Sequence, residues 1–102
     1  MSVEFEVQER EHFTVVHFRL SAPIDPKDLS LILSAAPVVS GNKGVIISGR
    51  GPVWLHSALA HKYHPCLWVA HYDPRVGAIV VESHTANVNI GDVIKVEDVP
   101  TD

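Results

Sequence analysis

The chain has 102 residues, of which 46% are hydrophobic and 20% charged, and its net charge is −4. This charge argues against a protein that coats long nucleic acids through a broad basic face. No apolar run approaches the roughly 20 residues of a membrane span, the N-terminus has no signal-peptide pattern, and the single Cys66 excludes an internal disulfide, so we expect a cytoplasmic protein.

The first half of the chain predicts two strands, a helix and a third strand. Residues 3–7 and 13–20 alternate apolar and polar side chains, as a pair of strands does. Asp25 before Pro26 is a helix-start signal, and leucines at helical spacing follow it. The β-branched run over residues 45–47 is short and bounded by glycines, which predicts a buried strand.

The second half predicts a helix and three more strands. The stretch from Pro52 contains no helix breaker until Pro65, which predicts a helix of about three turns. Strands are expected over residues 67–72, 77–82 and 93–96. Helix-linked strands in the middle and hairpins at both ends predict an α/β fold with a mixed sheet. The length fits a single domain over residues 1–102, and its modest core favours self-association.

Charge is distributed unevenly along the chain. Acidic residues crowd both ends, whereas the stretch from Lys43 to His84 contains four of the eight Lys and Arg residues and five of the seven histidines. A locally basic centre suits a small anionic ligand at a defined site, because field focusing depends on local charge. Chance clustering of charge is the alternative.

A glycine-rich turn joins the strand over residues 45–47 to the following helix. In Ser48-Gly49-Arg50-Gly51 the glycines let backbone amides approach an anion at the helix N-terminus, and the arginine adds a bidentate phosphate donor. The turn therefore predicts a phosphate site, although glycines serve any tight strand-to-helix turn equally well.

Two further groups of polar residues follow. His61 and His64 are three residues apart, so on a helix both project from one face toward a metal or a substrate; solvent exposure or helix capping is the alternative. Asp73 and Arg75 flank a proline at the carboxyl end of a strand, where α/β sheets bind ligands, but a surface salt bridge is equally compatible. His84 ends the next strand and could join them. The other histidines are assigned no role: His12, His17, His56 and His71.

Several of these motifs occur together, and in order, in one known family. Ser-Gly-Arg-Gly-Pro-Val-Trp-Leu, Ala-Leu-Ala-His-Lys-Tyr-His and Tyr-Asp-Pro-Arg-Val-Gly-Ala-Ile-Val-Val, with Gly-Asp-Val-Ile near the end, resemble the Csx-three family of small CRISPR-associated proteins over nearly the whole chain. The resemblance implies a Rossmann-like domain related to type III CRISPR sensor domains. It also implies a ring nuclease that linearises cyclic tetra-adenylate and so switches off antiviral signalling.

The family pattern also implies the cofactor, the assembly and the site residues. Activity is expected to need a divalent metal, preferably Mn²⁺, in a homodimer of which two copies sandwich the cyclic ligand. The catalytic residues fall on His64, Asp73 and Arg75, and the glycine turn, Ser48, Gly49, Arg50 and Gly51, is expected to bind ligand phosphates. The expected metal ligands are Asp73, His61, His64 and His84.

Two other functions use the same residues. One is an Mn²⁺-dependent 3′ exonuclease or deadenylase acting on linear RNA, which needs the same phosphodiester chemistry. The other is a sensor that binds cyclic oligoadenylate without cutting it.

Overall fold

The computed structural model describes residues 2–101, which form one six-stranded sheet with the strand order β1-β2-β3-β4-β5-β6. All the predicted strands and helices are confirmed, with ends shifted by a few residues at most. The elements are β1 (Val3–Glu9), β2 (Phe13–Leu20), the 3-10 helix η1 (Pro26–Asp28), α1 (Leu29–Ala35), β3 (Gly44–Ser48), α2 (Val53–Lys62), β4 (Trp68–Asp73), β5 (Gly77–Ser83) and β6 (Val93–Ile94).

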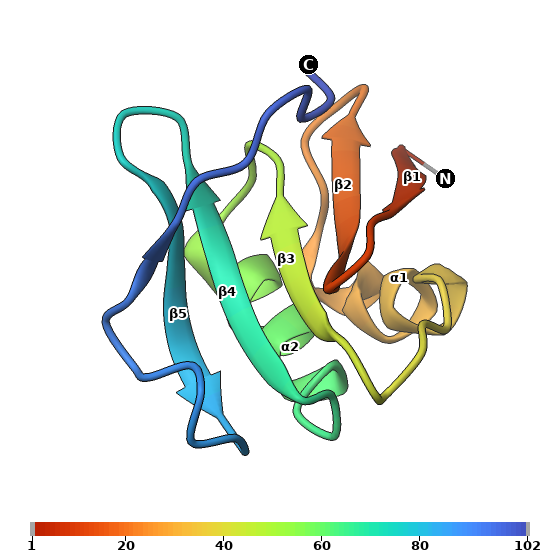
Figure 1. Ribbon diagram of the computed structural model, residues 1–102. Coiled ribbons are helices and arrows are strands. Elements are labelled where there is room, and N and C mark those ends of the chain that lie inside the picture. The colour runs from red at the N-terminus through yellow and green to blue at the C-terminus, as the bar shows by residue number, and fades with distance from the viewer. Residues whose placement is uncertain (1, 102) are drawn as a thin grey trace.

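The sheet is mixed, as predicted. β2, β3 and β4 are parallel to one another, while β1 pairs antiparallel with β2 and β5 with both β4 and β6. Two helical connections join parallel strands: α1 connects β2 to β3, and α2 connects β3 to β4. Both connections advance in the same direction along the sheet, so α1 and α2 lie on one face of it (Figure 1). A doubly wound Rossmann sheet has helices on both faces. The α/β class is confirmed, and kinship with Rossmann-like sensor domains stays a prediction.

The helices cover a continuous apolar core. Leu55 and Leu59, four residues apart on α2, are completely buried together with Phe18, Val45 and Ile47 from the sheet. The sequence starts the first helix as expected, because the Asp25 side chain accepts a hydrogen bond from the backbone N–H of Lys27 at 3.0 Å. The hydrophobic pattern therefore fixes which face each helix presents to the sheet.

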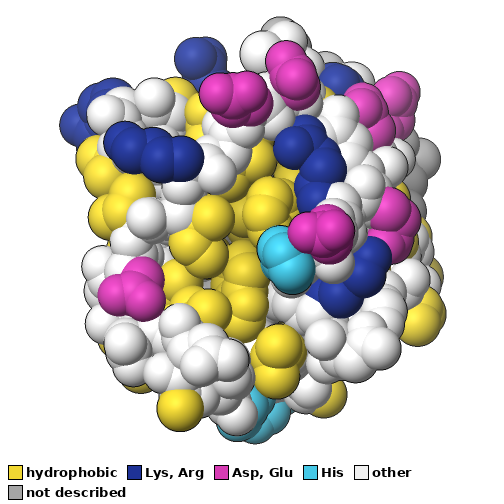
Figure 2. All heavy atoms as spheres, viewed as in Figure 1, with side chains coloured by type: hydrophobic (Ala, Val, Ile, Leu, Met, Phe, Trp, Pro, Cys, Tyr) yellow, Lys and Arg dark blue, Asp and Glu magenta, His cyan; other side chains and the backbone are white. Residues whose placement is uncertain are grey.

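The opposite face of the sheet has a second, thinner core. Val15, Ile46, Ala70 and Val80 are buried there, and the residues packed over them come largely from the chain after β5. Figure 2 shows this face, with hydrophobic side chains in its middle and charged side chains around them. We call it the open face because the helices lie on the other side.

Gly44 and Trp68 are in close contact at the start of β3 and β4. A Cβ atom at Gly44 would lie 1.9 Å from Cε2 of Trp68, so the indole packs against bare backbone. This contact explains why glycine rather than a β-branched residue begins β3. Within residues 2–101, no helix is long and apolar enough to cross a membrane.

Candidate functional site

β4 divides the predicted site residues into two groups. Ser48 and Asp73 end β3 and β4, whereas His64 precedes β4. Glu82 pairs with Val69 near the start of β4, which also brings His84 to that end. β4 has six residues, so its first and last residues are five steps of about 3.3 Å apart, or about 16 Å. We call the two ends of the sheet the carboxyl edge (residues 48–51 and 73–75) and the amino edge (His64, Glu82 and His84).

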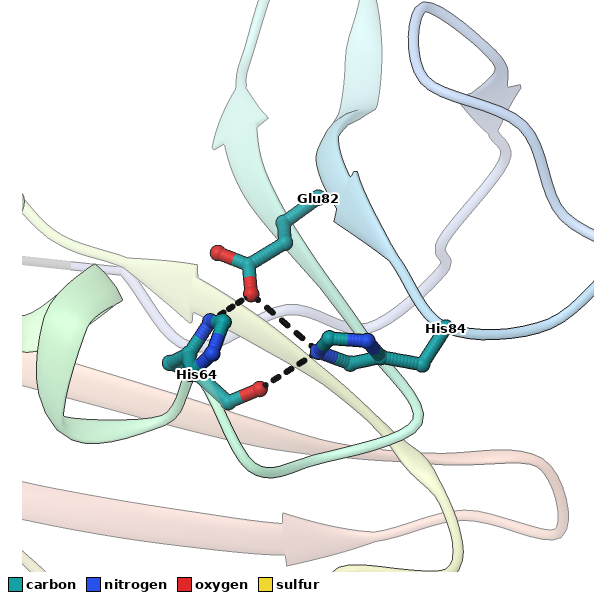
Figure 3. Close-up of side chains that lie close together, drawn as sticks. All are labelled: His64, Glu82 and His84. Carbon is teal, nitrogen blue, oxygen red and sulfur yellow. Dashed lines mark hydrogen bonds and ion pairs between the residues drawn. The ribbon is translucent and has the colours of Figure 1, made fainter.

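The amino edge groups two imidazoles and a carboxylate (Figure 3). Oε1 of Glu82 contacts Nδ1 of His64 and lies 3.3 Å from Nε2 of His84. One ligand atom from each of the three residues lies within 4.8 Å of the other two. The two imidazole rings meet edge to face with centroids 5.1 Å apart.

The hydrogen bonds of this cluster leave the carboxylate incompletely satisfied. Oε1 of Glu82 is buried, and no donor in the described part of the chain reaches it with hydrogen-bond geometry, although two ring nitrogens lie close by. Nε2 of His84 lies 3.0 Å from the backbone carbonyl oxygen of His64, to which it can donate when protonated. A buried acceptor beside two imidazole nitrogens is an arrangement that a cation would complete when those nitrogens carry no proton.

The donor set fits a divalent transition metal. Two imidazoles and one carboxylate form a common ligand set for such ions, and they leave coordination positions open for water or substrate. Binding at Nε2 of His84 would require the tautomer protonated at Nδ1, so the ring would give up its hydrogen bond to the His64 carbonyl. The site is therefore chemically competent for Mn²⁺ or a similar ion.

This cluster differs from the predicted ligand set. It contains His64 and His84, as expected, but it also contains Glu82, which the sequence analysis missed, and neither His61 nor Asp73 belongs to it. α2 ends at Lys62, so helical spacing does not place His64 beside His61. Pro65 explains this end, because the residue before a proline avoids the α conformation.

The carboxyl edge contains the glycine-rich turn. Gly49 has φ +140°, and a Cβ there would lie 2.5 Å from the carbonyl oxygen of Phe18, so only glycine fits. The turn leads into α2, whose N-cap residue Pro52 makes no side-chain capping hydrogen bond. The first backbone N–H groups of α2 are therefore not capped by the side chain of the N-cap residue. An anion that binds at a helix N-terminus uses such uncapped N–H groups.

Asp73 and Arg75 form a pair at the same edge. Oδ1 of Asp73 accepts hydrogen bonds from the backbone N–H of Arg75 at 2.9 Å and from its Nε at 3.3 Å, and Oδ2 accepts one from Nη2 at 3.1 Å. These hydrogen bonds lower the pKa of Asp73 and raise that of Arg75. The guanidinium is largely exposed, so it can turn toward a bound anion while the carboxylate stays ionised.

Two histidines that were assigned no role line the same edge. A cavity of about 640 Å³ on the helix side is lined in part by Gly51, His56, Ser57, His71, Asp73 and Arg75. The rings of His56 and His71 meet edge to face at 5.3 Å. Burial lowers the pKa of both imidazoles, and for His71 the neighbouring His56 lowers it further. The spacing of His71 and Asp73, two residues apart on one strand, is the signal that places both on the same face.

Fold and site together define a small α/β protein with a cluster of potential metal ligands at one sheet edge and a candidate anion-binding turn at the other. The chain belongs to the Csx-three family: the model described as CRISPR-associated protein (Cas_csx3) matches residues 17–95. An uncharacterized protein of Aquifex aeolicus (strain VF5) is 42% identical over 87 residues, which cover 82% of this chain and 78% of that relative.

Proposed function

We propose that the protein is a metal-dependent ring nuclease that binds and linearises cyclic tetra-adenylate and thereby switches off type III CRISPR signalling. Family membership supplies the CRISPR context. The observation that carries the proposal is the cluster of His64, Glu82 and His84, whose ligand atoms gather around a buried carboxylate oxygen. Such a cluster fits phosphodiester chemistry assisted by a divalent ion better than binding alone.

The cluster would hold Mn²⁺ through the imidazoles of His64 and His84 and the carboxylate of Glu82. When bound, the ion would supply Lewis-acid activation at the scissile phosphate. The turn over residues 48–51 would hold ligand phosphates through its backbone N–H groups and Arg50. Arg75 would stabilise the negative charge that develops on the phosphoryl oxygens, and Asp73 would orient the guanidinium and the attacking group.

The proposed reaction needs the metal ligands of the amino edge together with Asp73 and Arg75 of the carboxyl edge. Within one chain the two edges lie about 16 Å apart along β4. We therefore assign the complete site to two copies: His64, Glu82 and His84 of one copy face Asp73 and Arg75 of another across the cyclic ligand. This arrangement agrees with the homodimers, sandwiching the ligand, that the family resemblance implies. The polar residues at opposite sheet edges support it, because the amino edge alone lacks Asp73 and Arg75 and the carboxyl edge alone lacks His64.

The test is cleavage of cyclic tetra-adenylate by the protein with and without Mn²⁺, followed by chromatography of the products. We expect linear product only with the metal. His64→Ala and Asp73→Ala should each lower the rate on the order of 100-fold or more, because the first removes a proposed metal ligand and the second removes the carboxylate that would orient Arg75 and the attacking group. His12→Ala removes an exposed histidine that pairs with Glu11, and it serves as the matched control.

The alternatives predict different products. An intact ring at enzyme excess with Mn²⁺ present would refute the ring nuclease. Faster cleavage of linear than of cyclic tetra-adenylate would support the 3′ exonuclease instead. Tight binding of the ring that neither depends on metal nor gives product would support a sensor.

A further inference from the structure

A second cavity lies at the carboxyl edge, on the open face. Its volume is about 620 Å³, within the range of small-molecule sites. The glycine turn contributes Gly49 and Arg50 to its lining, and β4 and the turn after it contribute Tyr72 and Pro74. The turn expected to bind phosphate thus borders this cavity as well as the one on the helix side.

The floor of the cavity is a buried polar pair. His17 and Ser48 are directly opposite each other on the parallel strands β2 and β3, and each is only 2% exposed. Nδ1 of His17 lies 2.9 Å from Oγ of Ser48. A serine hydroxyl has one donor and two acceptor positions, so this bond leaves Ser48 with further hydrogen-bonding capacity. Most of the neighbouring positions on this face are apolar, so the pair gives the floor of the cavity a local polarity.

The outer wall is the chain over residues 96–101, which we call the strap. It crosses in front of the upper ends of β4 and β3 (Figure 1), and Val96, Val99 and Pro100 line the cavity. Nη2 of Arg10 donates to the carbonyl oxygen of Glu97 at 2.8 Å, and Nε of Arg19 donates to that of Thr101 at 3.0 Å. These bonds tie the strap to the sheet near both of its ends.

The lining combines flat and apolar walls with a few fixed polar groups. Tyr72 offers an aromatic surface, Val96 and Val99 offer apolar contact, and Ser48, oriented by His17, offers hydrogen bonds. This combination suits a nucleobase, which needs contact for its faces and partners for its edge. A phosphate on the glycine turn would place the attached nucleoside beside this cavity.

We propose that the cavity between the strap and the His17–Ser48 pair is a nucleoside subsite that takes the purine base of an adenylate whose phosphate lies on residues 48–51. The inference rests on the proposed function for the choice of adenylate. It adds His17, Tyr72 and the strap to the residues that would determine specificity.

Calorimetric binding of adenosine 5′-monophosphate and of ribose 5-phosphate to the full chain tests the subsite without any cleavage. The two probes share the phosphate and the sugar, so the difference between their affinities measures the contribution of the base. We expect the adenosine probe to bind on the order of tenfold more tightly, as one stacked base provides. Uridine 5′-monophosphate should bind more weakly than the purine probe. Equal affinity for the adenosine and ribose probes would overturn the proposal.

Two variants locate the base. His17→Leu should abolish the difference between the adenosine and ribose probes, and Val99→Trp should do the same by filling the cavity from the strap, outside the sheet. His12→Leu, at an exposed histidine, should leave the difference unchanged. If both the His17 and the Val99 variants keep the full difference while remaining folded, the base binds elsewhere and the proposal is wrong. Failure to cleave cyclic tetra-adenylate would refute the proposed function and leave this measurement intact.

Discussion

Replacing Glu82 with glutamine removes one negative charge from the amino edge and changes the side-chain shape little. Glu82 Oε1 lies close to both ring nitrogens of the cluster, so its charge acts directly on a cation held there. Two unit charges 4 Å apart interact by about 1 kcal/mol in water, and a divalent ion doubles this to about 2 kcal/mol. The side chains of Glu82, His64 and His84 are 31%, 56% and 46% exposed, so the value for water is the lower limit of this interaction.

Glu82→Gln should therefore weaken Mn²⁺ binding about 30-fold, which is the change in Kd that about 2 kcal/mol gives. The assay is a titration of protein with Mn²⁺, in which the electron paramagnetic resonance signal of the free aqueous ion reports the unbound fraction. Glu11→Gln is the matched control, because Glu11 also pairs with a histidine, at 2.8 Å, but in an exposed position outside the cluster. An unchanged Kd in Glu82→Gln would refute the assignment of the metal to the amino edge.

Two further predictions concern stability. Gly44→Ala should lower the free energy of unfolding by roughly 1–3 kcal/mol, because its Cβ would overlap Trp68. The control is Gly41→Ala, whose Cβ meets nothing closer than 3.9 Å and which should leave the free energy of unfolding nearly unchanged. Equal urea midpoints for the two variants would contradict this reasoning. Burial holds the pKa of His56 below its ordinary 6.5, so the unfolded chain takes up the proton more readily and stability should fall as the pH drops below about 6.5. Urea unfolding between pH 7.5 and 5 should show a shallower decline in His56→Leu, and an identical decline would show that His56 is not responsible.

The sequence predicts most of the fold because its periodic signals are local. The alternation over residues 13–20, the Asp25 cap and the spacing of Leu55 and Leu59 each depend on a few neighbouring residues, and the structure confirms all three. The extent of α2 is also determined locally. Its end at Lys62 depends on the proline two positions after the cap residue Tyr63.

The site could be predicted only in part, because its geometry depends on the pairing of distant strands. His64 and Asp73 are nine residues apart in sequence, yet a whole strand separates them in space. Glu82 joins His64 only through the register of β4 with β5, which places Glu82 opposite Val69. The spacing of Glu82 near the end of β5 and His84 just after it, two residues apart, was the available signal for the missing carboxylate.

The length of β4 has a consequence for mixtures of variants. If His64 acts at one edge and Asp73 at the other, a chain that has lost one of them still carries an intact opposite edge. Mixing inactive His64→Ala protein with inactive Asp73→Ala protein should then restore cleavage, because the sound amino edge of one meets the sound carboxyl edge of the other. Such complementation between two inactive variants would be a biochemical signature of an active site shared between molecules.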